Sequence, residues 1–418
     1  MTSTVENTIK NNLCINCGLC KTVCKFYAIK MVRNKYGEVN PVIDSEKCKN
    51  CGQCLRFCPM DKPKLETIAQ NLSEMENPHR HGLEDSKYYL AWDTNDAQRL
   101  KCCSGGAVTK IALYLLKSGK IDGMIHSERL WSKRGDLHYG ARLSTTLEEI
   151  NEHVSSTYQP LDFSEVLTKL EKGKTYFMTG TPCVIRGIKD LLQSNSDFKE
   201  IKIITCALIC SHNVNSKFVD FLAETNKLSD SEQWKVDMRA KDNTMSDANN
   251  FKNYIYTKGG KTLMNKNRFE SGWTNFWRFY YFAMNSCLYC PDFWGASADI
   301  SVKDAWGKWA SEDAKGKSIL VIRNEEVLQD FLNSGLEYEE LDWETMKDHQ
   351  KPTPVYKQTN AIYKFTQKPY SRQNRKSKFF RYCVNSKCSK FLYKNFGFEF
   401  TYHIMKVINA VTWLLEKI

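Results

Sequence analysis

The chain has 418 residues, of which 42% are hydrophobic, so it is long enough for two or three domains with sizeable cores and is not a disordered protein. Its formal net charge is +12, but no nucleic-acid-binding motif accompanies that charge, and we predict no nucleic-acid partner. The N-terminus lacks an apolar signal-peptide core, and no run of about 18 apolar residues is present, so we expect a cytoplasmic protein.

The chain divides by composition into four segments. Residues 1–60 are cysteine-rich with an internal two-fold repeat, and residues 36–44 between its halves read as a hairpin. Residues 61–95 are polar and predict a linker, and residues 96–350 alternate helical and strand-like runs, which is typical of an α/β domain. Residues 351–418 form a basic, helical tail with an apolar stripe at Ile404, Ile408, Val411, Leu415 and Ile418. The expected fold class is therefore α+β.

Three elements stand out in the segment 96–350. Residues 108–117 carry apolar side chains at helical spacing and follow Ser104-Gly105-Gly106, which marks a helix start. Residues 175–179 predict a strand that leads through Gly180-Thr181-Pro182 into a helix ending near Leu192. The apolar run 201–209 predicts a buried strand.

Eight cysteines of the N-terminal segment form two runs, Cys14-x2-Cys17-x2-Cys20-x3-Cys24 and Cys48-x2-Cys51-x2-Cys54-x3-Cys58-Pro59. In such a run three cysteines hold one iron–sulfur cluster and the fourth ligates the neighbouring one. We therefore assign one 4Fe-4S cluster to Cys14, Cys17, Cys20 and Cys58, and the other to Cys48, Cys51, Cys54 and Cys24. Zinc is the alternative, because Cys-x2-Cys pairs also bind zinc, but two runs of four match the cluster pattern. The segment is predicted to be a bacterial-type ferredoxin module.

Four later cysteines also have the surroundings of metal ligands: Cys183, Cys210, and the pair Cys287-x2-Cys290. Pro182 favours a helix start that places Cys183 in the first helical turn, where the helix dipole favours a thiolate. These cysteines are candidate ligands of a third cluster.

Over most of residues 8–310 the chain resembles the beta subunits of coenzyme F420-reducing hydrogenase and their dehydrogenase relatives. The resemblance lies in the double cysteine run, Ser104-Gly105-Gly106, the segment 179–183, the strand ending in Cys210, Ser286-Cys287-x2-Cys290, 298–300 and 304–307. It implies an FAD and iron–sulfur oxidoreductase with a third 4Fe-4S cluster on Cys183, Cys210, Cys287 and Cys290. It also implies flavin contacts at Ser104, Gly105, Gly106, Ser156, Tyr158, Thr179, Gly180, Thr181 and Pro182.

From the residues alone, the flavin site is less defined than the clusters. The chain has no Gly-x-Gly-x-x-Gly fingerprint, so a Rossmann site is not expected. The glycine turns at 104–106 and 180–182 precede helices and offer N–H groups to a pyrophosphate, but plain helix caps look the same. Only the resemblance favours the flavin interpretation.

Three motifs depart from the family pattern. The usual Gly-Ser-Lys-Tyr is Ser155-Ser156-Thr157-Tyr158, Cys-His-Gly is Cys210-Ser211-His212, and Gly-Asp is Lys303-Asp304. The missing lysine leaves the hydride partner open between a deazaflavin-type molecule and an unknown small substrate.

The expected function is electron transfer between that hydride donor or acceptor and a ferredoxin-like carrier or partner redox subunit, with no side chain assigned as proton donor. The rival is a non-catalytic relay subunit of a larger complex, linked to surface-polysaccharide synthesis as some bacterial relatives suggest. The basic tail is expected either to lie on the inner face of an anionic membrane or to pack on a partner protein.

The remaining cysteines and an aromatic run have simpler interpretations. Cys102 and Cys103 are expected to pack in the fold, because vicinal cysteines are strained as a disulfide, and Cys206 to be a buried strand residue. Cys383 and Cys388 are predicted to be inert. The aromatic run 273–282 either shields a cluster from water or belongs to an ordinary core.

Overall fold

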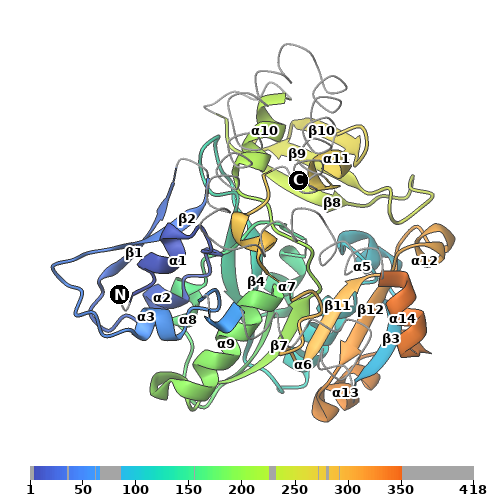
Figure 1. Cartoon of the computed structure of the whole chain (residues 1–418). Coiled ribbons are helices and arrows are strands. Elements are labelled where there is room, and N and C mark those ends of the chain that lie inside the picture. The colour runs from blue at the N-terminus through green and yellow to red at the C-terminus, as the bar shows by residue number, and fades with distance from the viewer. Residues whose placement is uncertain are drawn as a thin grey trace, which may run out of the picture.

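The computed structural model describes residues 4–34, 37–61, 63–65, 86–154, 156–225, 232–271, 273–278, 282–290 and 292–350. Figure 1 shows a small N-terminal module beside a large central sheet, with a third group of strands above that sheet. The predicted C-terminal stripe, Cys383 and Cys388 lie outside the described residues. No helix in the described part of the chain combines the length and apolar character that a membrane crossing requires.

The N-terminal module is built from two matching halves. Its elements are α1 (Glu6–Lys10), α2 (Leu19–Thr22), β1 (Ile29–Arg33), β2 (Val39–Ile43) and α3 (Gln53–Arg56). The short helices α2 and α3 each follow a left-handed glycine, Gly18 at φ 76° and Gly52 at φ 77°, a conformation that glycine adopts without strain. Strands β1 and β2 pair antiparallel, which confirms the predicted hairpin.

The central sheet has eight strands in the order β13-β3-β12-β11-β7-β6-β4-β5. They are β3 (Lys87–Asp93), β4 (Gly123–Arg129), β5 (Tyr139–Ser144), β6 (Thr175–Gly180), β7 (Lys202–Leu208), β11 (Ile300–Asp304), β12 (Ser318–Ile322) and β13 (Leu336–Leu341). The inner strands β4, β6, β7 and β11 are parallel, and the outer ones pair antiparallel. Together with the helices this confirms an α+β fold.

Strand β3 corrects the C-terminal end of the predicted linker 61–95. Its residues Tyr89, Leu90 and Ala91 are buried between β12 and β13, so they belong to the core of the main domain. The polar composition of the preceding residues masked a strand that is apolar only at its centre. We propose that the main domain begins at about residue 87 and keep the other predicted boundaries as proposals.

Both faces of the sheet are covered, because neighbouring strand residues point to opposite sides. Phe177 of β6 packs with α6 (Ala107–Lys117) and α13 (Glu325–Leu332), whereas Tyr176 and Met178 face α9 (Pro182–Ser194) on the other side. Elements α6, β6, α9 and β7 confirm the helix and strand predictions made for these segments. Further helices outside the second lobe are α5 (Asp96–Lys101), α7 (Leu147–Glu152), α8 (Ser164–Leu167), η2 (Ser196–Phe198), η3 (Asn285–Leu288), α12 (Lys308–Glu312) and α14 (Trp343–Gln350).

A second lobe contains the three-stranded antiparallel sheet β8 (Trp234–Ala240), β9 (Lys252–Thr257) and β10 (Thr262–Asn267). Helices α10 (Lys217–Thr225) and α11 (Trp273–Arg278) share its separate core, which contains the fully buried Trp234, Phe218 and Phe251. In Figure 1 this lobe lies above the carboxyl ends of the parallel strands. It therefore closes the edge of the sheet where binding sites of α/β folds form.

The N-terminal module is anchored at two places. Leu19 of α2 is fully buried and lies so close to Gly187 of α9 that a Cβ at Gly187 would sit 2.5 Å from the Leu19 Cδ1. Arg33 at the end of β1 bonds the Asp220 carboxylate of α10 at 3.1 Å, and the Ser216 hydroxyl donates to the Gly37 carbonyl at 2.8 Å. The module is thus fixed against both the main sheet and the second lobe.

Candidate redox site

The eight N-terminal cysteines form two neighbouring groups. Burial raises the pKa of Cys17, and the nearby charges of Cys58 and Cys14 raise it further. Burial also raises the pKa of Cys20, and the charges of Cys17, Cys14 and Cys58 act in the same direction. Burial also raises the pKa of Cys54, and here the charges that raise it further are those of Cys51 and Cys24, so Cys54 lies near these two cysteines. Cys58 thus joins the first run and Cys24 the second. The spacing predicts the same grouping, and the assignment of Cys58 to one cluster and Cys24 to the other stays a prediction.

Backbone N–H groups point at the sulfur atoms of these groups. The Asn16 N–H donates to the Cys14 Sγ at 3.4 Å, and the Ala28 N–H donates to the Cys24 Sγ at 3.4 Å. Burial raises the pKa of Cys14 to about 12, because a bare thiolate is poorly solvated there. N–H donors and bound iron both offset the charge of a thiolate, so this environment suits cluster ligands.

The four later cysteines also come together, from three separate segments. Cys183 lies in the first turn of α9, as predicted, Cys210 follows β7, and Cys287 lies in η3. Burial raises the pKa of Cys287, and the charges of Cys210, Cys183 and Cys290 raise it further, which places all four near one another. Because β6 and β7 are parallel neighbours, the residues after their carboxyl ends necessarily meet.

Polar groups also surround this third group. The Asn213 N–H donates to the Cys287 Sγ at 3.3 Å, and the Thr181 hydroxyl lies 3.3 Å from the Cys183 Sγ. Within the described residues, no group of three or more His, Cys, Asp or Glu has the close spacing that a single metal ion requires. Four cysteines are the donor set that a 4Fe-4S cluster uses.

The third group lies next to the first N-terminal group, which contains Cys14, Cys17, Cys20 and Cys58. Burial is the largest cause of the raised pKa of Cys17, and the charge of Cys183 is a smaller one, so the two side chains are close. Cys17, Cys58 and Cys183 also share one hydrophobic core with Leu19 and Val184. The three cysteine groups therefore form a row that runs from the outer end of the module into the main domain.

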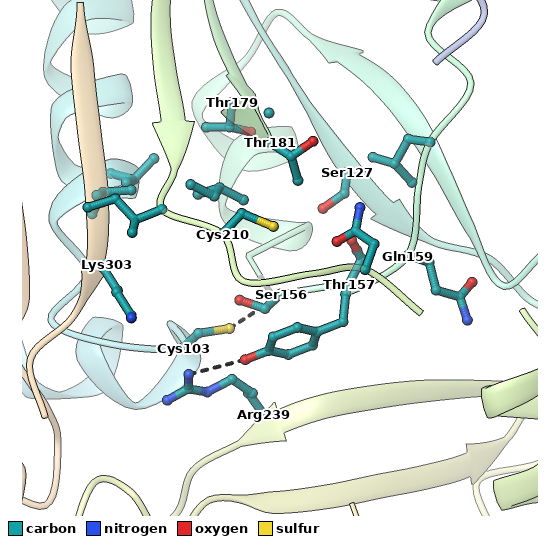
Figure 2. Close-up of a pocket in the computed structure, with 18 of the residues that line it drawn as sticks. Cys103, Ser127, Ser156, Thr157, Gln159, Thr179, Thr181, Cys210, Arg239 and Lys303 are labelled. Atoms are coloured by element: carbon teal, nitrogen blue, oxygen red, sulfur yellow. Dashed lines mark hydrogen bonds between the residues drawn. The ribbon is translucent and has the colours of Figure 1, made fainter. Parts of the chain in front are cut away.

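A cavity of about 690 Å³ begins at the third cysteine group. Eight of the nine predicted flavin contacts line it: Ser104, Gly106, Ser156, Tyr158, Thr179, Gly180, Thr181 and Pro182. Cys183, Cys210, Cys287 and Cys290 line it as well. Figure 2 shows Thr179, Thr181 and Cys210 on one side of this space and Arg239 across from them. Residues that are far apart in sequence thus share one site.

Gly105 is the predicted contact that does not line the cavity. Its N–H donates to the Ser318 hydroxyl at 3.1 Å, and a Cβ there would lie 2.6 Å from the Ala91 carbonyl oxygen. The Ser104 hydroxyl is likewise used, donating to the Lys317 carbonyl at 2.5 Å. The glycine therefore permits close packing against β3 and β12, and Gly106, at φ 81°, begins α6 at the cavity wall.

Tyr158 is held in an unusual conformation inside the cavity. Its φ of 56° is rare for a residue other than glycine, and the Val214 N–H fixes its carbonyl oxygen at 2.9 Å. The Arg239 guanidinium donates to the Tyr158 hydroxyl at 3.2 Å, and the Ser156 N–H donates to the Cys103 Sγ at 2.8 Å, both drawn in Figure 2. Such strain persists where surrounding contacts enforce it, commonly at functional sites.

Several cavity residues were not identified from the sequence. They are His126, His153, Arg239 and Arg268, with Cys103, which was expected to pack. Burial lowers the pKa of His126 to about 4, and the charges of His153 and Arg142 act in the same direction. These residues come from separate strands and loops, so no spacing in the sequence signals them. Cys102 and Cys206 are buried, as predicted.

The aromatic run 273–282 contributes to both the cavity and the core. Trp273 and Trp277 stack at 5.1 Å and line the cavity, and Trp277 stacks on His212 with ring centroids 3.9 Å apart. Phe282 packs on Phe218 in the core of the second lobe. Part of the run therefore belongs to an ordinary core, whereas the shielding of a cluster by Trp273 and Trp277 stays a prediction.

Grouped cysteines and a large cavity at the carboxyl ends of parallel strands define an iron–sulfur electron-transfer protein of the oxidoreductase class. Residues 88–168 match the family model "Coenzyme F420 hydrogenase/dehydrogenase, beta subunit N-term", and residues 173–349 match the corresponding C-terminal model. Two models of a 4Fe-4S dicluster domain match residues 13–62 and 40–88. The chain belongs to the coenzyme F420 hydrogenase/dehydrogenase beta-subunit family and carries a 4Fe-4S dicluster domain.

Two individual proteins are also similar. The uncharacterized protein MJ1349 of Methanocaldococcus jannaschii is 29% identical over 231 residues, which are 53% of this chain and 56% of that protein. The aligned part thus spans little more than half of the relative. A chain of the xenon-derivatized F420-reducing NiFe hydrogenase complex from Methanosarcina barkeri is 18% identical, with a TM-score of 0.46 over 66% of this chain and 90% of that one.

Proposed function

We propose that the protein is an FAD and 4Fe-4S oxidoreductase in which the cavity is the site of hydride exchange. The third cysteine group would hold a third 4Fe-4S cluster, and the cavity beside it would hold the flavin. A bound flavin exchanges electrons in pairs with an organic substrate, whereas clusters carry them one at a time. The cysteine row would connect the cavity to an electron partner outside.

The observation that carries this proposal is that the predicted ligands of the third cluster and the predicted flavin contacts lie around one cavity. The four later cysteines and eight predicted flavin contacts line a single cavity, and Cys183 in its wall lies close to Cys17 of the N-terminal module. Nothing in the local sequence requires this, since the segments are up to about 180 residues apart. A cavity of 690 Å³ is also within the size range of cofactor sites, about 300–1,000 Å³.

The cavity wall suits a flavin in three respects. The first turn of α6, from Ala107 to Thr109, lines it and offers N–H groups of a helix start to a pyrophosphate. Thr179, Thr181 and Ser127 add hydroxyl groups, and Trp273 and Trp277 add aromatic faces. His126 is buried and largely neutral near neutral pH, so it is able to donate or accept a hydrogen bond without a charge.

We propose that the electron partner is an acidic one-electron carrier protein or a partner redox subunit, docking at the outer end of the cysteine row. Cys51 is exposed there, and Phe26 and Lys49 border a small depression that Cys24, Cys48 and Cys51 share. Exposed Lys25, Lys30, Lys47 and Arg56 lie in the same module. Positive charge around an exposed aromatic patch favours a negatively charged partner. Twelve ligand thiols also favour a reducing compartment, for which we propose the cytoplasm.

Anaerobic purification with iron, sulfide and flavin measured per chain tests the proposal. We expect about twelve irons, four for each cluster, and one FAD in the wild type. Cys287→Ala should lose about four of these irons, while Cys206→Ala, a buried cysteine outside all three groups, should lose none. The flavin-loaded protein should reduce a dye with a deazaflavin or nicotinamide donor. Clusters without flavin would instead support a non-catalytic relay subunit.

A further inference from the structure

The end of the cavity that faces the second lobe is positively charged and aromatic. It is formed by Arg239 of β8, Arg268 after β10, Trp273 of α11 and Trp306 after β11, and we refer to it as the arginine end. The guanidinium groups of Arg239 and Arg268 lie over the Phe251 ring, 4.4 Å and 5.6 Å from its centroid. Phe251 also contacts Trp273, with ring centroids 5.1 Å apart, so these side chains gather around one ring.

Four hydrogen-bond donor atoms at the arginine end have no acceptor among the described residues. The Nε atoms of Arg239 and Arg268 and the indole Nε1 atoms of Trp273 and Trp306 are buried without a hydrogen-bond partner among the described residues. Arg239 and Trp273 are themselves only 5% and 4% exposed. A buried donor without a partner destabilises a folded protein, so four in one place indicate a binding site for a polar ligand.

The chemistry of these donors specifies the kind of ligand that they bind. Guanidinium and indole nitrogens donate hydrogen bonds and never accept them, so their partner must be rich in acceptors. Asp304 already pairs with Arg239, whereas Arg268 forms no ion pair with any described carboxylate. Burial lowers the pKa of Arg268, and the charge of Arg239 acts in the same direction, whereas the charge of Asp247 opposes both. An anion at this end relieves both effects, and guanidinium groups match phosphate geometry.

We propose that the arginine end is a subsite for the phosphate group of an organic ligand. The Arg239 and Arg268 guanidinium groups and the Trp273 and Trp306 indoles bind the phosphate oxygens. The start of α6 and the turn at Thr181 are separate places where a flavin pyrophosphate would lie, so the phosphate at the arginine end belongs to a second ligand, a phosphorylated substrate. This assignment to a second ligand rests on the proposed flavin site, whereas the subsite itself does not.

The test measures binding of inorganic phosphate to the full-length protein, with and without flavin, by titration calorimetry. We expect wild-type protein to bind phosphate, and Arg268→Gln to bind it at least about tenfold more weakly, because a hydrogen bond to a charged group is lost. Arg268→Lys should fall between the two, since it keeps the charge but loses the planar fork. The matched control is Lys266→Gln, an exposed side chain on the neighbouring β10 that does not line the cavity.

Flavin occupancy distinguishes the two sources of phosphate. Equal binding to flavin-loaded and flavin-free protein supports a second, phosphorylated ligand. Binding only to flavin-free protein, with FAD competing, supports the subsite but assigns it to the flavin pyrophosphate. If Arg268→Gln does not fold, Trp306→Phe keeps the ring and removes one donor, and should weaken phosphate binding about threefold.

Absence of phosphate binding to the wild type would overturn the proposal, as would equal binding by wild type and Arg268→Gln. The test also separates this inference from the proposed function. Protein that purifies and reconstitutes without flavin but binds phosphate through Arg268 keeps the subsite and rejects the flavoenzyme. Protein that takes up flavin but binds phosphate in neither its flavin-loaded nor its flavin-free form does the reverse.

Discussion

The N-terminal module and the cavity hold their candidate ligands in opposite ways. In the module, eight cysteines lie within 45 residues and are repeated with the same spacing, so a short stretch of chain determines both groups. In the cavity, the cysteines and polar residues come from α6, β6, α9, β8, η3, β11 and the segment after β7, and they meet only because the strands are ordered as they are. A local site survives many changes elsewhere, whereas a site of this second kind depends on the whole fold.

The largest expected effect breaks the row of cysteine groups at its middle. Cys58 belongs by sequence to the second run but lies with Cys14, Cys17 and Cys20, next to the third group. Cys58→Ala should remove about four irons per chain and stop electron flow from the cavity to an external carrier, while Cys206→Ala should do neither. Iron analysis and carrier reduction check this. Unchanged iron in Cys58→Ala would contradict the role of Cys58 as a cluster ligand.

A second change tests the contact between the two regions. A Cβ at Gly187 would lie 2.5 Å from Leu19 and 3.2 Å from Pro59, so Gly187→Val should overpack this contact and lower the free energy of unfolding by about 1–3 kcal/mol. Gly140→Val is the control, because a Cβ there meets nothing closer than 3.5 Å, and it should change stability by less than about 0.5 kcal/mol. Urea unfolding under anaerobic conditions measures both. Equal stabilities would mean that the module does not pack on α9 as described.

The third prediction concerns the pH dependence of stability that His126 in the cavity wall contributes. Burial holds the pKa of His126 near 4, below the value of about 6.5 in an unfolded chain, so the unfolded state binds the proton first. The contribution of neutral His126 to the free energy of unfolding is therefore complete above about pH 6.5. Between about pH 6.5 and about pH 4 this contribution falls by about 1.4 kcal/mol for each pH unit. His126→Asn should flatten this slope in unfolding measurements between pH 7 and 5. Ser144→Ala removes its hydrogen-bond partner but no titrating group, and should keep the slope.

The smallest expected effect lies at the outer end of the module. Lys49 is exposed beside the Cys48–Cys51 depression, so Lys49→Glu should slow electron transfer with an acidic carrier a few-fold, and more at low salt. Lys258→Glu makes the same charge change at an exposed residue in the turn between β9 and β10 of the second lobe, outside the N-terminal module, and should leave the rate unchanged. Stopped-flow measurements at two ionic strengths check this. The same slowing by both variants would point to overall charge instead of a docking surface.

Predictions from the sequence succeeded where the signal is short. The helix at 107–117, the strand at 175–180 and the hairpin around Gly37 follow from periodicity and turn residues. Strand β3 was missed, because only its central residues are apolar and it pairs with strands more than 200 residues later. Arg239 and Arg268 were missed for a related reason: neither carries a spacing pattern, and their neighbour Phe251 is brought to them by the sheet of the second lobe.

By itself the sequence determined the chemistry of the N-terminal module, because the spacing of cysteines within one turn already dictates which metal group they are able to hold. It also determined the family. Only the tertiary structure decided that the later cysteines, the glycine turns and the arginine end share one cavity. The physical reason is that parallel strands align their carboxyl ends whatever the intervening chain, so residues far apart in sequence become neighbours at one edge of the sheet.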